Sequence, residues 1–536
     1  MNKVLKGLVA VAATAAMAIA GVAGASTAMA ADTVNVTVPA TTNLENHTYT
    51  AYQILSGTQA TSGGALGDAA WGSGIKGDDF LTALKRDTTI GRYFEDVTDA
   101  KGFAEALSNT ANFPADGANA RLVAKIAMKN KQGEGTALTA PTTQLDKGYY
   151  LIVDSTAGGQ TVYNPAVLAI TSDIEITDKT DVPTLEKKVQ ENKKDVTGDT
   201  AYGSKFNDVA DYNIGDDVPF HLIGSVPDMS QYETYKYTFS DTLGEGFNAP
   251  TSVKVYLSDN KALDAGDSNI TDSFTITSPL TKTFTVSTNN LKAVAGATTG
   301  KYVIVSYTAK LNSSAQIGLP GNVNTAKLTY SNKPDQSGQG ENQPTGETPE
   351  DKVIVFTYGL DVTKVDSKNA ETKLKDAEFK LKNSDDKWAT ITDGKVTGWA
   401  DVESQGSVLK SGEDGKFKVE GLDDGDYTLK ETKAPAGYNL PANGFSVKLT
   451  ATTANNQAWG GEYNAATALT ELTVNQTDNT GDVNTGLGAI TIRNTQGSSL
   501  PSTGGMGTTI LYAAGAAIVL VAAFGIAFAV RRRNAR

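Results

Sequence analysis

Alternation of apolar and polar residues dominates the long central part of the chain and predicts β-strands. Stretches such as VNVTVP and TYTAYQILSG near the start, YKYTFSDTL and KYVIVSYTAKL in the middle, and LDVTKVD further on show the two-residue period of a pleated strand. A helical period appears in ANARLVAKIAMKNKQ, where Leu122, Val123, Ile126 and Ala127 share one face. The sequence therefore predicts a mainly β protein with a mixed α+β region on its N-terminal side.

The strands group into three regions. Residues 31–181 mix strands with a helix, which predicts an α+β N-terminal domain. Residues 182–333 and 353–497 carry regularly spaced strands, typical of tandem immunoglobulin-like β-sandwiches. The TDGK and EDGK stretches of the last region have the Asp-Gly chemistry of tight hairpin turns. Residues 334–352 are polar, contain three prolines and lack apolar periodicity, so they are predicted to be a linker.

Apolar runs mark both ends of the chain. Residues 510–530 read ILYAAGAAIVLVAAFGIAFAV, which as a helix would be about 30 Å long, the thickness of a bilayer core. The arginines of residues 531–536 place this tail in the cytoplasm by the positive-inside rule. Residues 1–30 combine two lysines, an Ala- and Val-rich run and a small-residue cleavage site, which predicts a secretory signal peptide. We expect everything between the two runs to lie outside the cell.

The composition argues against several classes of function. A net charge of −13 disfavours binding to nucleic acid or to anionic membranes. With no cysteine and only two histidines, His47 and His221, we expect no thiol catalysis, no Ser-His-Asp triad and no zinc site with His or Cys ligands. We expect neither a metal nor a cofactor. Because 60 acidic residues always supply some carboxylate pair, a wall-bound glycosidase or peptidase is kept as an alternative that predicts one deep carboxylate-lined cleft.

The motif LPSTG lies shortly before the C-terminal apolar run and consists of Leu500, Pro501, Ser502, Thr503 and Gly504. Together with the run, the basic tail and the signal peptide, it resembles the cell-wall sorting signal of Gram-positive bacteria. The resemblance implies that a sortase, of the pilin type or the housekeeping type, cuts between Thr503 and Gly504. The acyl group then passes to an amine of peptidoglycan or of another protein. The apolar run would be a transient single-span anchor, and the mature protein would be covalently attached to the wall.

The stretch YTLKETKAPAGYNL, residues 427–440, closely resembles the E-box of Cna B-type domains, with the pattern Y-x-L-x-E-T-x-A-P-x-G-Y filled at every position. In that family, a lysine of the first strand bonds covalently to an asparagine of the last strand while the E-box glutamate assists. The resemblance assigns these roles to Lys364, Asn494 and Glu431.

The residue pattern around the lysine supports this assignment. Leu360, Val362 and Lys364 share one face of a strand, so the apolar side carries the lysine inward. Desolvation disfavours the charged forms of both a buried amine and a neighbouring carboxyl group. A neutral amine is a nucleophile, and a protonated carboxyl group can polarise an amide and pass protons to departing ammonia. Contact between the groups supplies an effective concentration of about 10⁵ M or more, enough for one slow turnover.

The middle region resembles the middle domain of Gram-positive backbone pilins, with DYNIGDDVPF adding to the match. Lys187 lies on the apolar face of its first strand, whereas Lys188 points away. The resemblance implies a second cross-linking set of Lys187, Asp241 and Asn332. Asn324 lies on the same face of the last strand and is the alternative partner.

A polymerising subunit also needs an accessible lysine to receive Thr503 of the next subunit. Members of the family often carry it in a Tyr-Pro-Lys motif at the end of the first domain, and this motif is absent from the chain. Lys179 of EITDKTDVPTLEKKV occupies the corresponding place and is our candidate acceptor, with Lys187 and Lys188 as rivals. The opening strands of the first region contain no lysine, so no first-strand cross-link is expected there.

The resemblance as a whole implies a major pilin, a structural and non-enzymatic shaft subunit that is cross-linked within and between subunits and supports adhesion. Its expected partners are a sortase, identical subunits, peptidoglycan, minor or tip pilins, and a host ligand that the sequence does not identify. The alternative within the same class is a monomeric wall-anchored adhesin built of the same modules.

Overall fold

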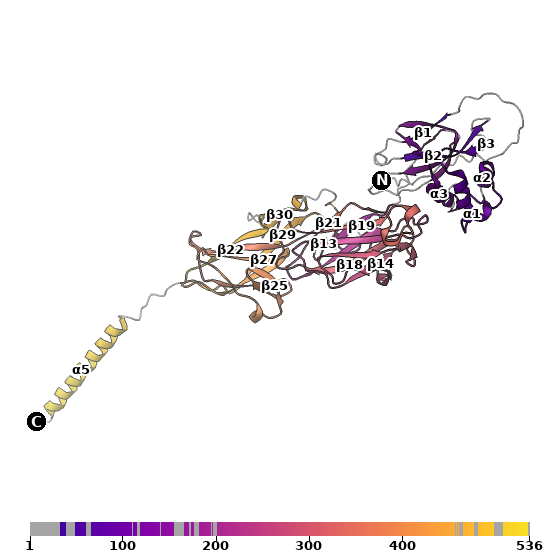
Figure 1. Cartoon of the computed structure of the whole chain (residues 1–536). Helices are drawn as coiled ribbons and strands as arrows, with labels where there is room; N and C mark the ends of the chain where they lie inside the picture. Colours follow the sequence, from indigo (N-terminus) through magenta and orange to yellow (C-terminus); the bar gives the residue numbers. More distant parts are fainter. Residues whose placement is uncertain are drawn as a thin grey trace.

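Three domains and one long helix follow one another along an elongated molecule in the computed structural model (Figure 1). The signal-peptide region and the LPSTG motif lie outside the described residues. The structure describes residues 33–38, 49–59, 66–109, 111–114, 118–139, 141–154, 166–170, 173–175, 182–194, 196, 201–455, 457, 459, 465–475, 481–497 and 507–533.

The first domain consists of two sheets with helices packed on one of them, which confirms the α+β prediction. The larger sheet has the order β3-β2-β6-β7 with β4 beside β2, and the smaller has the order β5-β1-β8. Under the helices, Trp71, Phe80 and Phe103 form a cluster with ring centroids 5.3 to 6.1 Å apart. The predicted helix is α3, whereas α1 and α2 were not predicted from the sequence. The elements are β1 (Thr33–Thr37), β2 (Tyr49–Gln59), β3 (Leu66–Trp71), α1 (Gly77–Arg86), α2 (Ala100–Leu107), α3 (Ala118–Asn130), β4 (Thr136–Leu138), β5 (Thr142–Asp146), β6 (Gly148–Asp154), β7 (Ala166–Ile170) and β8 (Ile174–Glu175).

The middle domain is a β-sandwich, as predicted. One sheet has the order β10-β9-β12-β18-β14-β15 and the other β11-β21-β19-β13-β17-β16, with β20 beside β19. Inward side chains of both sheets, such as Phe220 and Phe239, form one continuous core. The strands are β9 (Leu185–Gln190), β10 (Phe206–Asn207), β11 (Val209–Asp211), β12 (Asp217–Ser225), β13 (Tyr237–Leu243), β14 (Val253–Ser258), β15 (Ser268–Asn269), β16 (Thr275–Ile276), β17 (Thr283–Thr288), β18 (Tyr302–Lys310), β19 (Asn322–Ser331), β20 (Thr345–Glu347) and β21 (Asp351–Phe356).

The linker prediction for residues 334–352 is wrong, because this segment folds onto the middle domain. It contains two short 3₁₀ helices and β20, which pairs with the end of β19. Polar side chains make the packing possible: Ser337 and Gln343 are buried, and the Ser331 hydroxyl donates a 2.9 Å hydrogen bond to the Gln343 side chain. Because the segment is held by hydrogen-bonded polar side chains and not by apolar ones, its packing leaves no apolar periodicity in the sequence.

The third domain wraps nine strands into the order β30-β29-β28-β23-β24-β25-β27-β22-β31, with β26 beside β23. The TDGK stretch joins β24 to β25 through Asp393 and Gly394, both with positive φ, as a tight hairpin requires. The elements are β22 (Tyr358–Asp366), β23 (Glu378–Asn383), β24 (Trp388–Thr392), β25 (Lys395–Ala400), β26 (Leu409–Lys410), β27 (Lys416–Leu422), β28 (Gly425–Lys433), β29 (Phe445–Thr453), α4 (Ala465–Ala468), β30 (Leu469–Val474) and β31 (Leu487–Asn494).

The strand β21 joins the middle and third domains because its two faces belong to different cores. Val353 and Val355 pack into the middle-domain core, whereas Ile354 and Phe356 pack into the core of the third domain. Only Thr357 separates β21 from β22. The two domains therefore share apolar packing as well as a chain connection.

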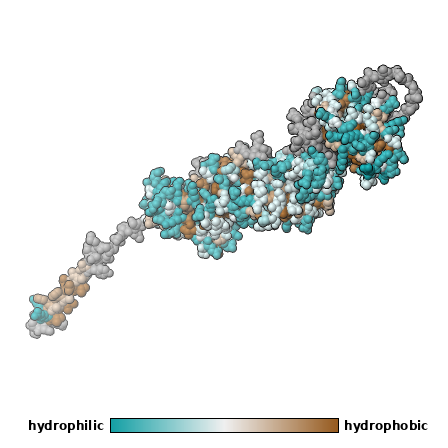
Figure 2. Space-filling model, in the orientation of Figure 1, coloured by the Kyte–Doolittle hydropathy of each residue, from teal (hydrophilic) through white to brown (hydrophobic). Residues whose placement is uncertain are grey.

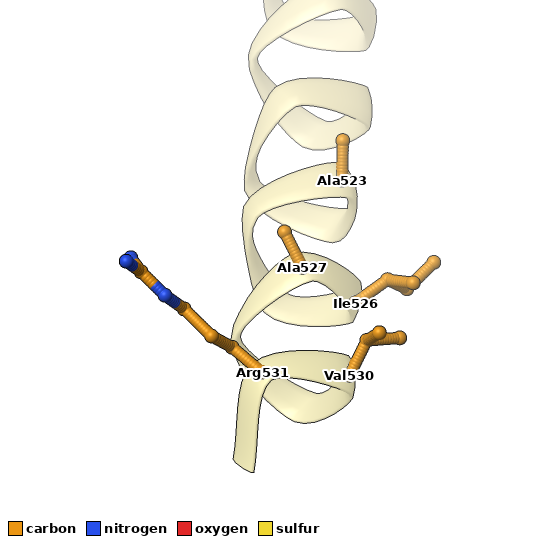
Figure 3. Close-up of a pocket in the computed structure, with 5 residues that line it drawn as sticks. All are labelled: Ala523, Ile526, Ala527, Val530 and Arg531. Carbon is orange, nitrogen blue, oxygen red and sulfur yellow. The ribbon is translucent and has the colours of Figure 1, made fainter. Parts of the chain in front are cut away.

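The C-terminal helix α5 (Gly507–Arg533) stands apart from the domains. Residues 513–532 are long and apolar enough to cross a membrane, and none of this stretch is buried in the protein. Figure 2 shows its apolar surface bare, and Figure 3 shows Ile526 and Val530 projecting from one side while Arg531 projects from the other. A bare apolar helix ending in arginines is what a single-span anchor requires.

Candidate functional site

A lysine, a glutamate and an asparagine meet inside the third domain. The Lys364 Nζ donates a hydrogen bond to Asn494 Oδ1, and it lies 3.4 Å from Glu431 Oε2. The Asn494 Nδ2 in turn donates to Glu431 Oε1 at 2.8 Å. All three side chains are buried, at 0%, 3% and 1% exposure. The structure thus brings together the three residues that the E-box resemblance selected.

Strand pairing creates this contact. The first strand β22 and the last strand β31 lie parallel and adjacent, with Asp366 opposite Asn494 and Lys364 two positions earlier. Glu431 reaches the same point from β28. The rings of Phe379 and Phe445 flank the ammonium group, with their centroids 5.7 and 5.6 Å from Nζ.

The apolar surroundings change the ionisation of the lysine and of the acid. Burial lowers the pKa of Lys364 to about 8, an effect that the negative charge of Glu431 only partly opposes. Burial also raises the pKa of Glu431, against the opposing influence of Lys364. At neutral pH, roughly one-tenth of a lysine with that pKa is neutral. The site therefore supplies a nucleophilic amine next to the amide carbon of Asn494 and an acid next to its nitrogen.

A second set lies in the core of the middle domain. Lys187, from β9 in one sheet, donates hydrogen bonds to Asp241 Oδ2, from β13 in the other sheet, and to the hydroxyl of Tyr307 at 3.2 Å. The same hydroxyl donates to Asp241 Oδ2 at 3.0 Å and accepts from Asn324 Nδ2 at 2.7 Å. Lys187, Asp241 and Asn324 are buried to 1% exposure or less.

Asn324 rather than Asn332 lies at this second set, which corrects our first choice of partner. Strand β19 pairs Ala326 with Asp241, so Asn324 is two residues away from that position and Asn332 is six. Six residues of strand correspond to about 20 Å. Asn332 is buried near the start of the 334–352 segment, where its backbone N–H donates to Pro344. Alternation in the sequence assigns both asparagines to one face, so only the strand register, with Ala326 opposite Asp241, distinguishes them.

Tyr307 was not identified from the sequence. The signal that could have found it is the alternation in KYVIVSYTAKL, which places Val303, Val305 and Tyr307 on one face of β18. A tyrosine on an otherwise apolar inward face needs a partner for its hydroxyl.

An acceptor lysine must be accessible, and the structure tests this for two of the three candidates. Lys179 lies outside the described residues, as does the sorting motif. Lys188 is 6% exposed and bonded to Asp208 at 2.6 Å, so it is not an accessible amine. Lys187 is fully buried.

Of the histidines, His221 is buried and stacked on Phe206 with ring centroids 3.9 Å apart, and His47 lies outside the described residues.

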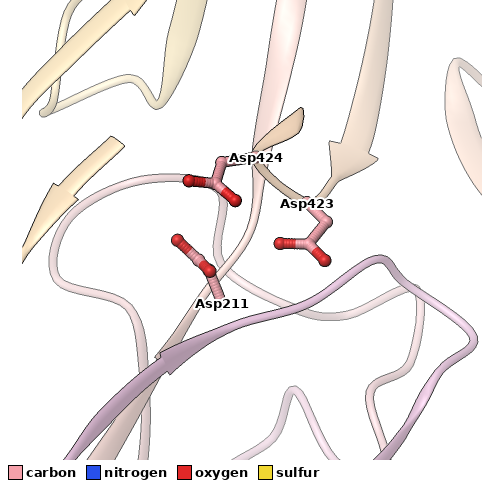
Figure 4. Close-up of side chains that lie close together, drawn as sticks. All are labelled: Asp211, Asp423 and Asp424. Atoms are coloured by element: carbon pink, nitrogen blue, oxygen red, sulfur yellow. The ribbon is translucent and has the colours of Figure 1, made fainter. Parts of the chain in front are cut away.

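A cluster of charged side chains lies where the middle and third domains meet. Asp211, Asp423 and Asp424 point toward one another (Figure 4), and one oxygen of each lies within 4.8 Å of the others. Lys194 Nζ sits 2.7 Å from Asp211 and 2.9 Å from Asp424, and Lys193 Nζ lies 3.0 Å from Asp423. Because two ammonium groups already contact all three carboxylates, we interpret the cluster as an ion-paired joint between domains.

Two family models match this chain, one within the third domain and one at the C-terminal anchor region. Residues 359–462 match the SpaA family, described as a prealbumin-like fold domain, and residues 493–535 match the LPXTG cell wall anchor motif. The trypsin-resistant surface T6 protein of Streptococcus pyogenes is 29% identical over 43% of this chain, and fimbrial subunit type 2 of Actinomyces naeslundii is 26% identical over 61%. One of these relatives is thus named as a surface protein and the other as a fimbrial subunit. The anchor motif followed by the apolar helix α5 fits a cell-wall-anchored surface protein.

The matched segments span 48% and 59% of those two relatives. Among solved structures, the T6 backbone pilin of serotype M6 Streptococcus pyogenes is 17% identical with a TM-score of 0.50, over 87% of this chain and 98% of that one. At this identity the likeness concerns the fold alone.

Proposed function

We propose that this protein is the major shaft subunit of a covalently polymerised, cell-wall-anchored pilus, stabilised by an internal isopeptide bond in each of its two sandwich domains. The observation that carries the proposal is the buried contact of Lys364 with Asn494 and Glu431 between the first and last strands of the third domain. The names of the relatives and the anchor motif support the same function.

In the third domain, Lys364 Nζ attacks the side-chain carbon of Asn494, and the amide nitrogen leaves as ammonia. Glu431 contacts both the attacking nitrogen and the departing nitrogen, so it can take a proton from one and return it to the other. In the middle domain, Lys187 and Asn324 form the corresponding bond across the two sheets, with Asp241 as the acid. A chain without cysteine gains covalent closure of long loops in this way.

Polymerisation requires a sortase to join Thr503 of one subunit to a lysine of the next. Lys179 precedes the middle domain in the sequence, whereas the sorting motif follows the third domain. Head-to-tail linkage between different surfaces of identical subunits grows as an open filament. Adhesion to host or other cells would then follow from display of the filament on the wall, with minor or tip pilins as further partners.

The proposed role is structural rather than enzymatic. The close carboxylates at the domain joint do not form a substrate cleft, because Asp211 and Asp423 are fully buried and paired with lysines. An immunoblot of cell-wall extract tests the polymer directly. A ladder of high-mass species supports the shaft subunit, whereas a single wall-attached band identifies a monomeric adhesin of the same modules.

A further inference from the structure

The two cross-linking sets differ in how the acid reaches the departing amide nitrogen. In the third domain, Glu431 Oε1 accepts a hydrogen bond from Asn494 Nδ2 directly, at 2.8 Å. In the middle domain, the hydrogen bonds of Asp241 go to Lys187 and Tyr307, and none joins Asp241 to Asn324 among the described residues. A reaction that depends on the acid alone would lack a proton donor at the leaving nitrogen of Asn324.

The Tyr307 hydroxyl fills this gap. It lies 3.2 Å from Lys187 Nζ, 3.0 Å from Asp241 Oδ2 and 2.7 Å from Asn324 Nδ2, so it contacts the nucleophile, the acid and the leaving group at once. The ring is held in place by Phe220, stacked at 5.4 Å between centroids, and by Phe284, edge-on at 5.2 Å. The hydroxyl is therefore placed to pass a proton between the acid and the leaving group.

We propose that Tyr307 is a catalytic residue of the middle domain, which relays a proton between Asp241 and the departing nitrogen of Asn324 during isopeptide formation. This inference rests on the proposed function, because it requires the Lys187–Asn324 bond. It assigns to two residues, an acid and a phenol, the task that Glu431 performs alone in the third domain.

Isopeptide formation in the middle domain conserves every proton of the reacting groups. Lys187 passes one proton to Asp241, which leaves a neutral amine and a neutral acid. The Lys187 Nζ bonds to the side-chain carbon of Asn324, the Tyr307 hydroxyl gives its proton to Nδ2, and Asp241 gives its proton to Tyr307. Asp241 then takes the second proton from Nζ, the bond from carbon to Nδ2 breaks, and ammonia leaves. The products are one amide, one ammonia molecule, a protonated Asp241 and an unchanged tyrosine.

Burial favours the protonation states that this sequence needs. It raises the pKa of Tyr307 well above the ordinary value, so the phenol keeps its proton at neutral pH. It also lowers the pKa of Lys187 and raises that of Asp241, which favours the neutral amine and the neutral acid. General acid–base groups of this kind typically contribute about 10² to 10⁴ in rate.

The test follows bond formation in the full-length chain as it folds. The chain is synthesised in a cell-free reaction with lipid nanodiscs, quenched with acid at timed points and digested, and joined Lys187–Asn324 peptides are quantified by mass spectrometry. Tyr307→Phe keeps the ring and removes only the hydroxyl, so we expect joining to slow roughly 100-fold or more. Tyr237→Phe is the matched control, since that buried hydroxyl donates to the Ser225 backbone in the same core and should leave the rate unchanged.

A second measurement separates catalysis from packing. Fluorinated tyrosines placed at position 307 keep the size of the ring but change the acidity of the phenol, so the joining rate should follow that acidity. The Lys364–Asn494 peptide in the same digest reports that the chain has folded. If the wild-type chain joins Lys187 to Asn324 and Tyr307→Phe joins at the same rate, the relay is refuted while the cross-link stands. A rate insensitive to phenol acidity also refutes the relay, and no joined peptide in the wild type refutes the cross-link itself.

Discussion

Replacing Glu431 with glutamine should free a long loop of the third domain from covalent closure. Glutamine preserves the shape of the side chain but cannot carry a proton from Lys364 to the leaving nitrogen of Asn494. The amine and the amide would stay in contact without reacting. The intact chain should therefore retain one more ammonia than the wild type, which intact-mass measurement detects.

The size of the mechanical effect follows from the sequence separation of the two cross-linked residues. Lys364 and Asn494 are 130 positions apart and touch in the folded domain. Once that loop unfolds, it adds roughly 450 Å of extended chain. In the chain-entropy account, closing a loop of this length stabilises the folded domain by about 5 kcal/mol, which the variant loses.

Glu431→Gln also leaves a buried amine without its acid, and breaking a buried pair in this way costs about 3 to 5 kcal/mol more. The sum approaches the whole stability of an ordinary domain. Lys364→Met separates the two contributions, because it removes both the bond and the buried charge while keeping an apolar side chain of similar length. We expect both variants to unfold under force, and Glu431→Gln to unfold at a lower force than Lys364→Met.

Single-molecule stretching of the extracellular part of the chain measures both the added length and the unfolding force. The wild type should lack the step of roughly 450 Å, and both variants should show it. Glu413→Gln is the matched control, since that carboxylate of the same domain is 85% exposed; apart from the mass of the substitution itself, it should change neither the ammonia loss nor the extension. The prediction is refuted by a wild-type chain that shows the long step, or by a Glu431→Gln chain that loses as many ammonia molecules as the wild type.

Three further predictions concern processing, assembly and pH. Wall-released protein should end at Thr503, and a final wall form that retains the RRRNAR tail would contradict sortase cleavage. Lys179→Arg should abolish high-mass ladders while the monomer stays folded and anchored; ladders that persist would exclude Lys179 as the acceptor. Burial raises the pKa of Glu191 at the domain joint to about 7, so the folded chain holds a proton that the unfolded chain releases above its ordinary pKa near 4.5. The free energy of unfolding should then fall by roughly 3 kcal/mol between pH 4.5 and 7 and level off above, and Glu191→Gln should flatten this dependence in urea titrations.

The third-domain set could be predicted because two independent signals coincide there. The E-box names the glutamate, and the alternation through Leu360 and Val362 turns Lys364 inward. Asn494 is the final residue of the last strand of that domain, so its selection did not depend on the register between two strands. Local pattern and strand order were sufficient.

The middle-domain partner could not be selected in the same way. Alternation places Asn324 and Asn332 on one face, but it contains no information on how far β19 slides along β13. That register is set by packing of the whole sandwich. The ion-paired cluster between the two domains could not be predicted from the sequence for a related reason. Lys194 and Asp424 are 230 positions apart and become neighbours only after both domains fold.

The two proposed bonds and the shared strand define where the shaft can stretch. Tension enters the middle domain near Lys187, crosses to Asn324, and enters the third domain along β22 as far as Lys364 before crossing to Asn494. The only chain between the bonds is the 40 positions from Asn324 to Lys364, worth roughly 130 Å if extended. This segment includes β20 and β21, which pair with β19, and the alternate faces of β21 are buried in both cores. The segment between the two bonds therefore carries the tension itself, and it is also the segment that packs the middle and third domains together. Extending this segment requires the cores of both domains to open where they meet.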